Sequence, residues 1–180
     1  MKRFVFLAFI CSLFSCQNNS NQTDNNPVDS LSYQDFDQNP IGVDKGCKWL
    51  KDNIELYFQK DGSIEIMRAM TTPEYFEFKN DAINTGLEMD SSITEFELNQ
   101  KWKNKFDLKT AGIGSGFLIS GQDWKNIQVS NCNLINQTPQ EINYKILISD
   151  CDFQTDYNRD IKLILDQNNQ IKIADIKEYD

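Results

Sequence analysis

The sequence predicts an α+β domain in which N-terminal helices pack on a curved antiparallel meander sheet. Apolar residues recur at helical spacing between about 44 and 106, and they alternate with polar residues at strand spacing from 127 to 176. Helices followed by strands indicate a layered fold rather than a parallel sheet with crossover helices. The chain has 180 residues, of which 39% are hydrophobic, so it can form one domain with a sizeable core.

The first predicted helix begins at Asp44, whose side chain is expected to cap it, and ends near Asp61 and Gly62. Residues 63–71 fit a short helix or an extended segment, and both alternatives stay open. The apolar residues of the first helix share one face: Trp49, Leu50, Ile54, Tyr57 and Phe58.

Two more helices have recognisable starts. Thr72 precedes Pro73 and Glu74, which gives a hydroxyl cap, proline in the first turn and an early acid, and Gly86 is the expected stop. The segment Ser92–Glu95 has the form of a capping box. The helix that it opens is expected to bury Leu98, Trp102 and Phe106.

The second half of the chain has a period of two, which predicts half-buried strands. The last two strands can be placed in register, with Leu163 opposite Ile173 and Leu165 opposite Ile171. Gln167–Asn169 is then a three-residue loop, in which asparagine tolerates the left-handed conformation. The alternating sets are Ile127 and Val129; Ile142, Tyr144, Ile146 and Ile148; Ile161, Leu163 and Leu165; and Ile171, Ile173 and Ile176.

Three segments accompany this order of elements: MTTPEYFEFKNDAI at 70–83, Gln122-Asp123-Trp124, and Tyr157–Ile161. With them, residues 45–180 resemble the nuclear transport factor 2-like (cystatin-like) superfamily. That resemblance implies a cone of helices and sheet around a pocket, and a generic helix-plus-meander fold is the alternative.

The N-terminus predicts export and lipidation. Lys2 and Arg3 precede an apolar stretch that is too short to span a bilayer, as in a signal peptide. Leu13-Phe14-Ser15-Cys16 then resembles the lipobox of bacterial lipoproteins, such as the envelope lipoproteins of Bacteroidota, although Phe14 is bulkier than usual. The resemblance implies cleavage before Cys16, lipid on its thiol and a cell-envelope location, at the outer membrane facing the periplasm. An ordinary signal peptide with a coincidental cysteine is the alternative.

The segment after Cys16 is expected to be a disordered tether. Residues 17–40 are mostly Asn, Gln, Ser, Thr and Asp, and none of them is basic. Such a composition cannot bury enough apolar surface to fold. The predicted organisation is therefore a signal peptide at 1–15, the lipidated cysteine and tether at 16–42, and one α+β domain at 43–180.

Composition excludes several functions. The net charge of −9 repels phosphate backbones, so we expect no nucleic-acid partner. The chain has no histidine, which removes Ser-His and Cys-His nucleophile pairs and HExxH zinc sites. After Cys11 and Cys16, an odd set remains (Cys47, Cys132 and Cys151), so at least one of these thiols is free or joins another chain.

Two motifs that suggest chemistry fail on inspection. Gly112–Gly116 lacks the Gly-Lys-Ser/Thr ending of a phosphate loop, so we expect a loop or strand entry. Asp150–Asp156 has acids at positions 1, 3 and 7 of a calcium loop but Thr155 at the required glycine and Ile161 at the required glutamate. We therefore predict no metal site, no cofactor and no catalytic residue.

Aromatic side chains supply most of the expected core, and some of them are candidates to line a pocket. We expect the domain to bind a protein partner or a small ligand without catalysis. One alternative is a carboxylate-based isomerase or hydrolase that combines Arg68 or Arg159 with Asp123, Asp160 or tyrosines; another is an immunity-type lipoprotein that neutralises a toxin. The candidate pocket residues are Trp49, Tyr57, Tyr75, Trp102 and Trp124.

Lipidation at Cys16 is directly testable. We expect the Cys16→Ser protein to leave the membrane fraction. Without the Cys16 thiol the protein carries no acyl chains, and several acyl chains are what would anchor it stably. Mass spectrometry of the native N-terminus should find a lipidated Cys16 as the first residue. An unmodified N-terminal peptide that starts elsewhere, or a Cys16→Ser protein that stays membrane-bound, would overturn the assignment.

Overall fold

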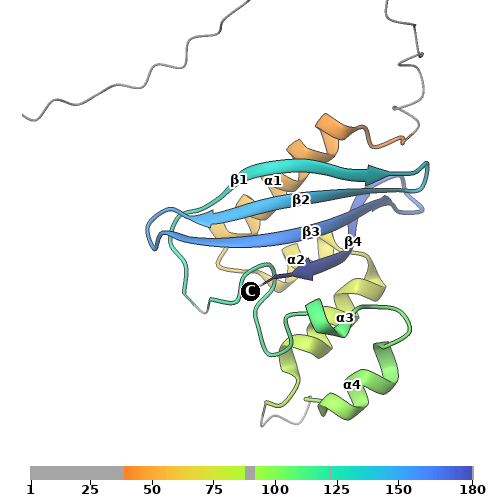
Figure 1. Ribbon diagram of the computed structural model, residues 1–180, viewed down its shortest axis with the longest axis vertical. Coiled ribbons are helices and arrows are strands. Elements are labelled where there is room, and N and C mark those ends of the chain that lie inside the picture. The colour runs from red at the N-terminus through yellow and green to blue at the C-terminus, as the bar shows by residue number, and fades with distance from the viewer. Residues whose placement is uncertain (1–38, 88–91, 122, 180) are drawn as a thin grey trace, which may run out of the picture. The chain divides into compact units, whose positions relative to one another are not determined.

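In the computed structural model, residues 39–87, 92–121 and 123–179 are described, and four helices precede a four-stranded antiparallel sheet. The helices are α1 (Val43–Gln59), α2 (Ile64–Met70), α3 (Pro73–Asn84) and α4 (Glu95–Trp102). The strands are β1 (Ile127–Gln137), β2 (Glu141–Asp150), β3 (Thr155–Leu165) and β4 (Ile171–Glu178). Because α1 packs on β1 and β2 while α2 and α3 pack on β4 (Figure 1), the predicted α+β class is confirmed.

The first helix forms where its apolar spacing predicts it, with one correction at its start. Asp44 lies in the first turn of α1, and the residue at the cap position is Gly42. The prediction that Asp44 caps this helix is therefore wrong. Its carboxylate still interacts favourably with the partial positive charge at the helix N-terminus. The ambiguous segment after Gly62 is helical over α2, and it places Met67 and Met70 in the core.

Both later helix starts are present, but one is shifted. The Thr72 hydroxyl accepts from the Tyr75 backbone N–H at 3.1 Å, as predicted for the start of α3. The capping box of α4 consists of Thr94 and Glu97, so the box predicted at Ser92–Glu95 is two residues too early. Glu97 is the residue that can reach back to the backbone N–H of Thr94, at 2.9 Å.

The sheet is a meander, in the order β1-β2-β3-β4. The predicted register of the last hairpin is confirmed, since Leu163 pairs with Ile173 and Leu165 with Ile171. Asn169 has φ 57°, the left-handed conformation that the short loop requires. A bulge after Lys162 lets Ile176 pair with Ile161, which explains the three-residue spacing from Ile173 to Ile176.

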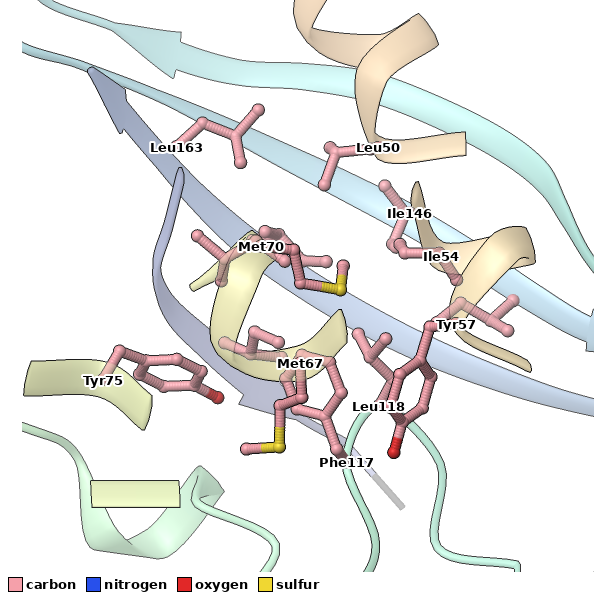
Figure 2. Packing of buried hydrophobic residues seen from close by; sticks show 14 of the residues in the cluster. Leu50, Ile54, Tyr57, Met67, Met70, Tyr75, Phe117, Leu118, Ile146 and Leu163 are labelled. Carbon is pink, nitrogen blue, oxygen red and sulfur yellow. The ribbon is translucent and has the colours of Figure 1, made fainter. Parts of the chain in front are cut away.

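The space between the helices and the sheet is filled by side chains. In the view of Figure 2, Met67 and Met70 of α2 lie between Tyr75 on one side and Leu118 and Tyr57 on the other. All five of these side chains are less than 9% exposed. Flexible methionines suit such an irregular space, because three rotatable bonds let them adapt to their neighbours.

A glycine inside α1 allows helix and sheet to approach closely. A Cβ atom on Gly46 would lie 2.3 Å from the Tyr144 hydroxyl oxygen, so no other residue fits without displacing the tyrosine. The Tyr144 hydroxyl donates to the backbone oxygen of Val43 at 2.7 Å. Burial raises the pKa of Tyr144 to about 12, so this hydroxyl keeps its proton, and the contact, at neutral pH.

A disulfide bond joins the first helix to the first strand. Cys47 on α1 is bonded to Cys132 on β1, with their Cα atoms 6.0 Å apart. Cys151, in the turn after β2, is an exposed free thiol. The odd set of three cysteines is thereby divided into one bridge and one thiol.

The packed domain includes residues that precede its predicted boundary. Asn39 and Ile41 are 4% and 2% exposed, and the Asn39 side-chain amide donates to the Thr138 carbonyl at 2.6 Å. These two residues belong to the packed domain rather than to a tether. The predicted signal peptide, Cys16 and the predicted tether up to residue 38 lie outside the described residues. Within the ranges that are described, every helix is too short or too polar to cross a bilayer.

The disulfide should contribute measurably to stability. It links residues 85 positions apart, so Cys47→Ser should lower the free energy of unfolding by about 2–4 kcal/mol. Urea unfolding checks this value, with Cys151→Ser as the matched control that removes an exposed thiol and changes stability by less than about 0.5 kcal/mol. Equal unfolding midpoints for the two variants would contradict the prediction.

Candidate functional site

Three charged side chains, Lys79, Arg159 and Glu178, form a buried ion cluster between the helices and the sheet. Lys79 and Arg159 are 0% exposed and Glu178 is 7% exposed. Lys79 Nζ lies 2.6 Å from Glu178 Oε1, and an Arg159 guanidinium nitrogen lies 3.8 Å from Glu178 Oε2. Burial and the Glu178 charge raise the pKa of neighbouring Tyr75 well above its usual value, so that phenol stays neutral.

The buried ion cluster also holds the loop that follows the helices. Lys79 Nζ donates to the carbonyl oxygens of Ala111 at 2.9 Å and Gly112 at 3.3 Å. Arg159 Nε donates to the carbonyl oxygen of Leu118 at 2.8 Å. These bonds offset the cost of burying charge and fix the loop against the core.

Gly112, in the predicted loop Gly112–Gly116, has a packing role. Its φ is +58°, and a Cβ atom there would lie 2.1 Å from Glu178 Oε2. The loop can approach the carboxylate this closely because glycine has no side chain. The segment is a loop, as predicted, and its glycine lets the backbone pack against the buried ion cluster.

The five candidate pocket residues do not lie together. Tyr57 and Trp124 belong to one aromatic group, in which Trp124 contacts Phe58 edge-on with ring centroids 5.3 Å apart. Tyr75 and Trp102 belong to a second group, built around Phe78 and Phe106. Tyr57, Tyr75 and Trp102 are buried core residues, whereas Trp124 is half-buried.

Trp49, the fifth candidate, lines a surface depression of about 460 Å³ between α1, α2 and the start of β4. We call it the Trp49 depression. Its apolar part consists of Trp49, Leu56, Ile66, Ala69, Met70 and Ile171. Its polar part consists of Lys45, Asn53, Asn169, Gln170 and Lys172. Trp49 is half-buried and Leu56 is 41% exposed, so apolar surface faces the solvent here.

A second depression, of about 280 Å³, lies on the sheet face that the helices leave open. We call it the sheet-face depression. Its residues are Ile135, Asn136, Glu141, Asn143, Asp160, Lys162, Asp175 and Lys177. Burial raises the pKa of Asp175, while the charges of Lys162 and Lys177 oppose that shift. Asp160 accepts from the Tyr179 hydroxyl at 2.8 Å, and its other carboxylate oxygen is buried without a donor among the described residues.

The arginines and acids considered for catalysis are not brought together. Arg159 and Asp160 are successive residues of β3, so their side chains point to opposite faces of the sheet. Arg68 lies over the Phe76 ring, 4.0 Å from its centroid, and Asp123 is exposed in the segment before β1. The one carboxylate in the interior cluster, Glu178, is paired with Lys79.

The acidic segment after β2 forms a turn, as the failed calcium motif suggested. Asp150 accepts backbone N–H groups from Lys125 at 2.9 Å, Asp152 at 3.0 Å and Phe153 at 3.1 Å. Although burial alone would raise its pKa, these bonds lower the pKa of Asp150 below its usual value. Among the described residues, no three His, Cys, Asp or Glu side chains are placed to share a metal ion.

Sequence reasoning found Trp49 but missed most residues of the Trp49 depression. Lys45, Trp49 and Asn53 follow one another at four-residue spacing on α1, which is a detectable signal of one helix face. The contributions of Ala69 and Lys172 depend on how α2 meets the edge of β4, which local spacing cannot show.

Comparison with known proteins gives no relative: no family model, curated protein or solved structure matches this chain.

Breaking the buried ion cluster should cost much more than breaking an exposed pair. Lys79→Met leaves the Glu178 charge without its closest partner, so we expect the free energy of unfolding to fall by about 3–5 kcal/mol. The control, Lys101→Met, removes a lysine that pairs with Glu77 and Asp81 at the surface and should cost about 1 kcal/mol or less. Chemical denaturation of both variants measures the difference. Equal losses of unfolding free energy would show that the buried ion cluster contributes no more to stability than an exposed pair.

Proposed function

We propose that this protein is an envelope lipoprotein, anchored through lipid on Cys16, whose domain binds a protein partner or small ligand at the Trp49 depression. The domain is proposed to be of the nuclear transport factor 2-like, or cystatin-like, kind. Helices packed on one face of a meander sheet support that assignment. The proposed location is the outer membrane, on its periplasmic side.

The disulfide supports an exported protein. Bridges such as Cys47–Cys132 persist in oxidising compartments, whereas cytosolic thiols are generally kept reduced. The lipobox at Leu13–Cys16 and the basic, apolar segment before it agree with this compartment. Both observations point to a domain that works outside the cytoplasm.

The Trp49 depression is the observation that carries the binding function. Its volume of about 460 Å³ falls in the range of about 300–1,000 Å³ that is usual for ligand sites. It combines an apolar surface with a few polar groups, which is the usual composition of such sites. A half-buried tryptophan is also the residue type most often found at energetic centres of protein interfaces.

The two alternative functions receive different support. A carboxylate enzyme would need a buried acid in an open apolar cavity, but no acid lines the Trp49 depression and Glu178 is paired with Lys79. An immunity-type lipoprotein is favoured by one observation, the sheet-face depression. Of its three acids, Glu141 pairs with Lys162 at 3.2 Å, which leaves Asp160 and Asp175 to face a basic partner.

Site-specific crosslinking in the producing cells tests the binding proposal. The membrane-anchored protein should carry, at Asn53, a photoreactive residue that inserts into nearby C–H bonds. On irradiation this residue should crosslink to one defined partner or ligand. The same adduct should be lost in Trp49→Ala, because removing an interface tryptophan costs about 2 kcal/mol or more, which is a roughly thirtyfold weaker affinity.

Two controls make the result specific. Trp124→Ala removes a half-buried indole that does not line the Trp49 depression, so it should keep the adduct. The photoreactive residue at exposed Asn99 on α4 should give no adduct of the same mass. Equal capture from Asn53 and Asn99, or an adduct that survives Trp49→Ala, would overturn the proposal.

A further inference from the structure

The Trp49 depression offers an apolar surface built from three elements. Trp49 and Leu56 come from α1, Ile66 and Met70 from α2, and Ile171 from the start of β4. Leu56 is 41% exposed, so part of this apolar surface contacts water in the unbound domain. Covering it with an apolar group releases that water and gives roughly 25 cal/mol per Å² buried.

The charged side chains that line this surface are both lysines. Lys45 and Lys172 line the depression, and no Asp or Glu does. This is unusual in a protein of net charge −9, and the sheet-face depression of the same domain contains three acids beside its two lysines. The lysines of the Trp49 depression therefore form a local positive edge in an acidic protein.

The two ammonium groups are available to a ligand. Lys172 Nζ donates to the backbone oxygen of Ala69, near the C-terminal end of α2, and this bond fixes the ammonium at the edge of the apolar surface. The ammonium has three donors, so two remain. Lys45 makes no hydrogen bond or ion pair with any described residue. Asn169 and Gln170 add amide groups from the turn before β4.

From this arrangement we propose that the Trp49 depression binds an anionic amphiphile, with its apolar body on Trp49 and Leu56 and its carboxylate or phosphate between Lys45 and Lys172. The inference rests on the proposed function and names the ligand class of that site. A cationic amphiphile would be repelled by the lysines. A neutral one would leave the Lys45 ammonium and the two remaining donors of Lys172 without a partner in the ligand.

Three probes with the same ten-carbon chain separate these cases: decanoate, decanol and decyltrimethylammonium, all used as monomers. The protein starting at Gln17 keeps the whole described domain and lacks only the signal peptide and the lipidated cysteine. In its amide NMR spectrum, decanoate should shift the Trp49 indole and the backbone amides of Leu56, Ala69 and Ile171. Decanol should bind more weakly at the same place, and decyltrimethylammonium should leave these signals unchanged.

Lysine variants test the charge directly. The double variant Lys45→Gln with Lys172→Gln should weaken decanoate about tenfold, since each partly exposed charge pair contributes up to about 1 kcal/mol. Decanol binding should not change. The control Lys48→Gln removes a neighbouring lysine that pairs with Asp52 and does not line the depression, so decanoate affinity should be retained. Raising the salt concentration should weaken decanoate but not decanol.

Vesicles distinguish the two sources of such a ligand. If phosphatidylglycerol vesicles displace decanoate and phosphatidylcholine vesicles do not, the anionic group belongs to a membrane lipid. If neither kind displaces it, the ligand is a free amphiphilic acid. Both results support the proposed class.

The ligand class would be overturned by equal affinity for decanoate and decanol, or by NMR shifts of residues outside the Trp49 depression. Unchanged decanoate affinity in the double variant would also overturn it. The proposed function fails separately, through the crosslinking at Asn53. A specific adduct there, together with no preference for decanoate over decanol, would keep the site and reject the anionic character of its ligand.

Discussion

The structure depends on the pairing of Lys79 with Glu178 inside the domain. These residues are 99 positions apart, and their contact ties the middle of α3 to the last residue of β4. Burying either charge alone would be costly, so each requires the other to be in place. Lys79 and Arg159 also donate hydrogen bonds to three carbonyl oxygens of the loop after α4. The buried ion cluster therefore positions the segment from which Phe117 and Leu118 enter the core.

The filled interior directs binding to the surface. Methionines of α2 and the loop residues Phe117 and Leu118 occupy the space between helices and sheet (Figure 2), where the family resemblance implied a pocket. Two surface depressions instead lie at the edge of β4 and on the open sheet face. The first is apolar with lysines and the second is polar with both acids and lysines, so these two surfaces differ chemically.

Predictions that depended on local spacing succeeded best. The register of the last hairpin followed from the alternation of Leu163, Leu165, Ile171 and Ile173, since a shift by one residue would turn the apolar set to water. The capping predictions at Asp44 and Ser92 failed because the chain enters these helices elsewhere: at Gly42 for α1, where no side chain caps the helix, and at Thr94 for α4. Packing of the chain before each helix decides where it begins.

The sequence by itself determined the fold class and the order of the elements, because period and turn residues are local properties. It could not show that Lys79 would be buried, since a lysine on a helix is ordinarily solvated. Only the tertiary structure brought Glu178 and Arg159 beside it and separated the five candidate aromatic residues into different parts of the domain. Those contacts join distant segments, and their geometry follows from how α3, β3 and β4 pack rather than from any spacing along the chain.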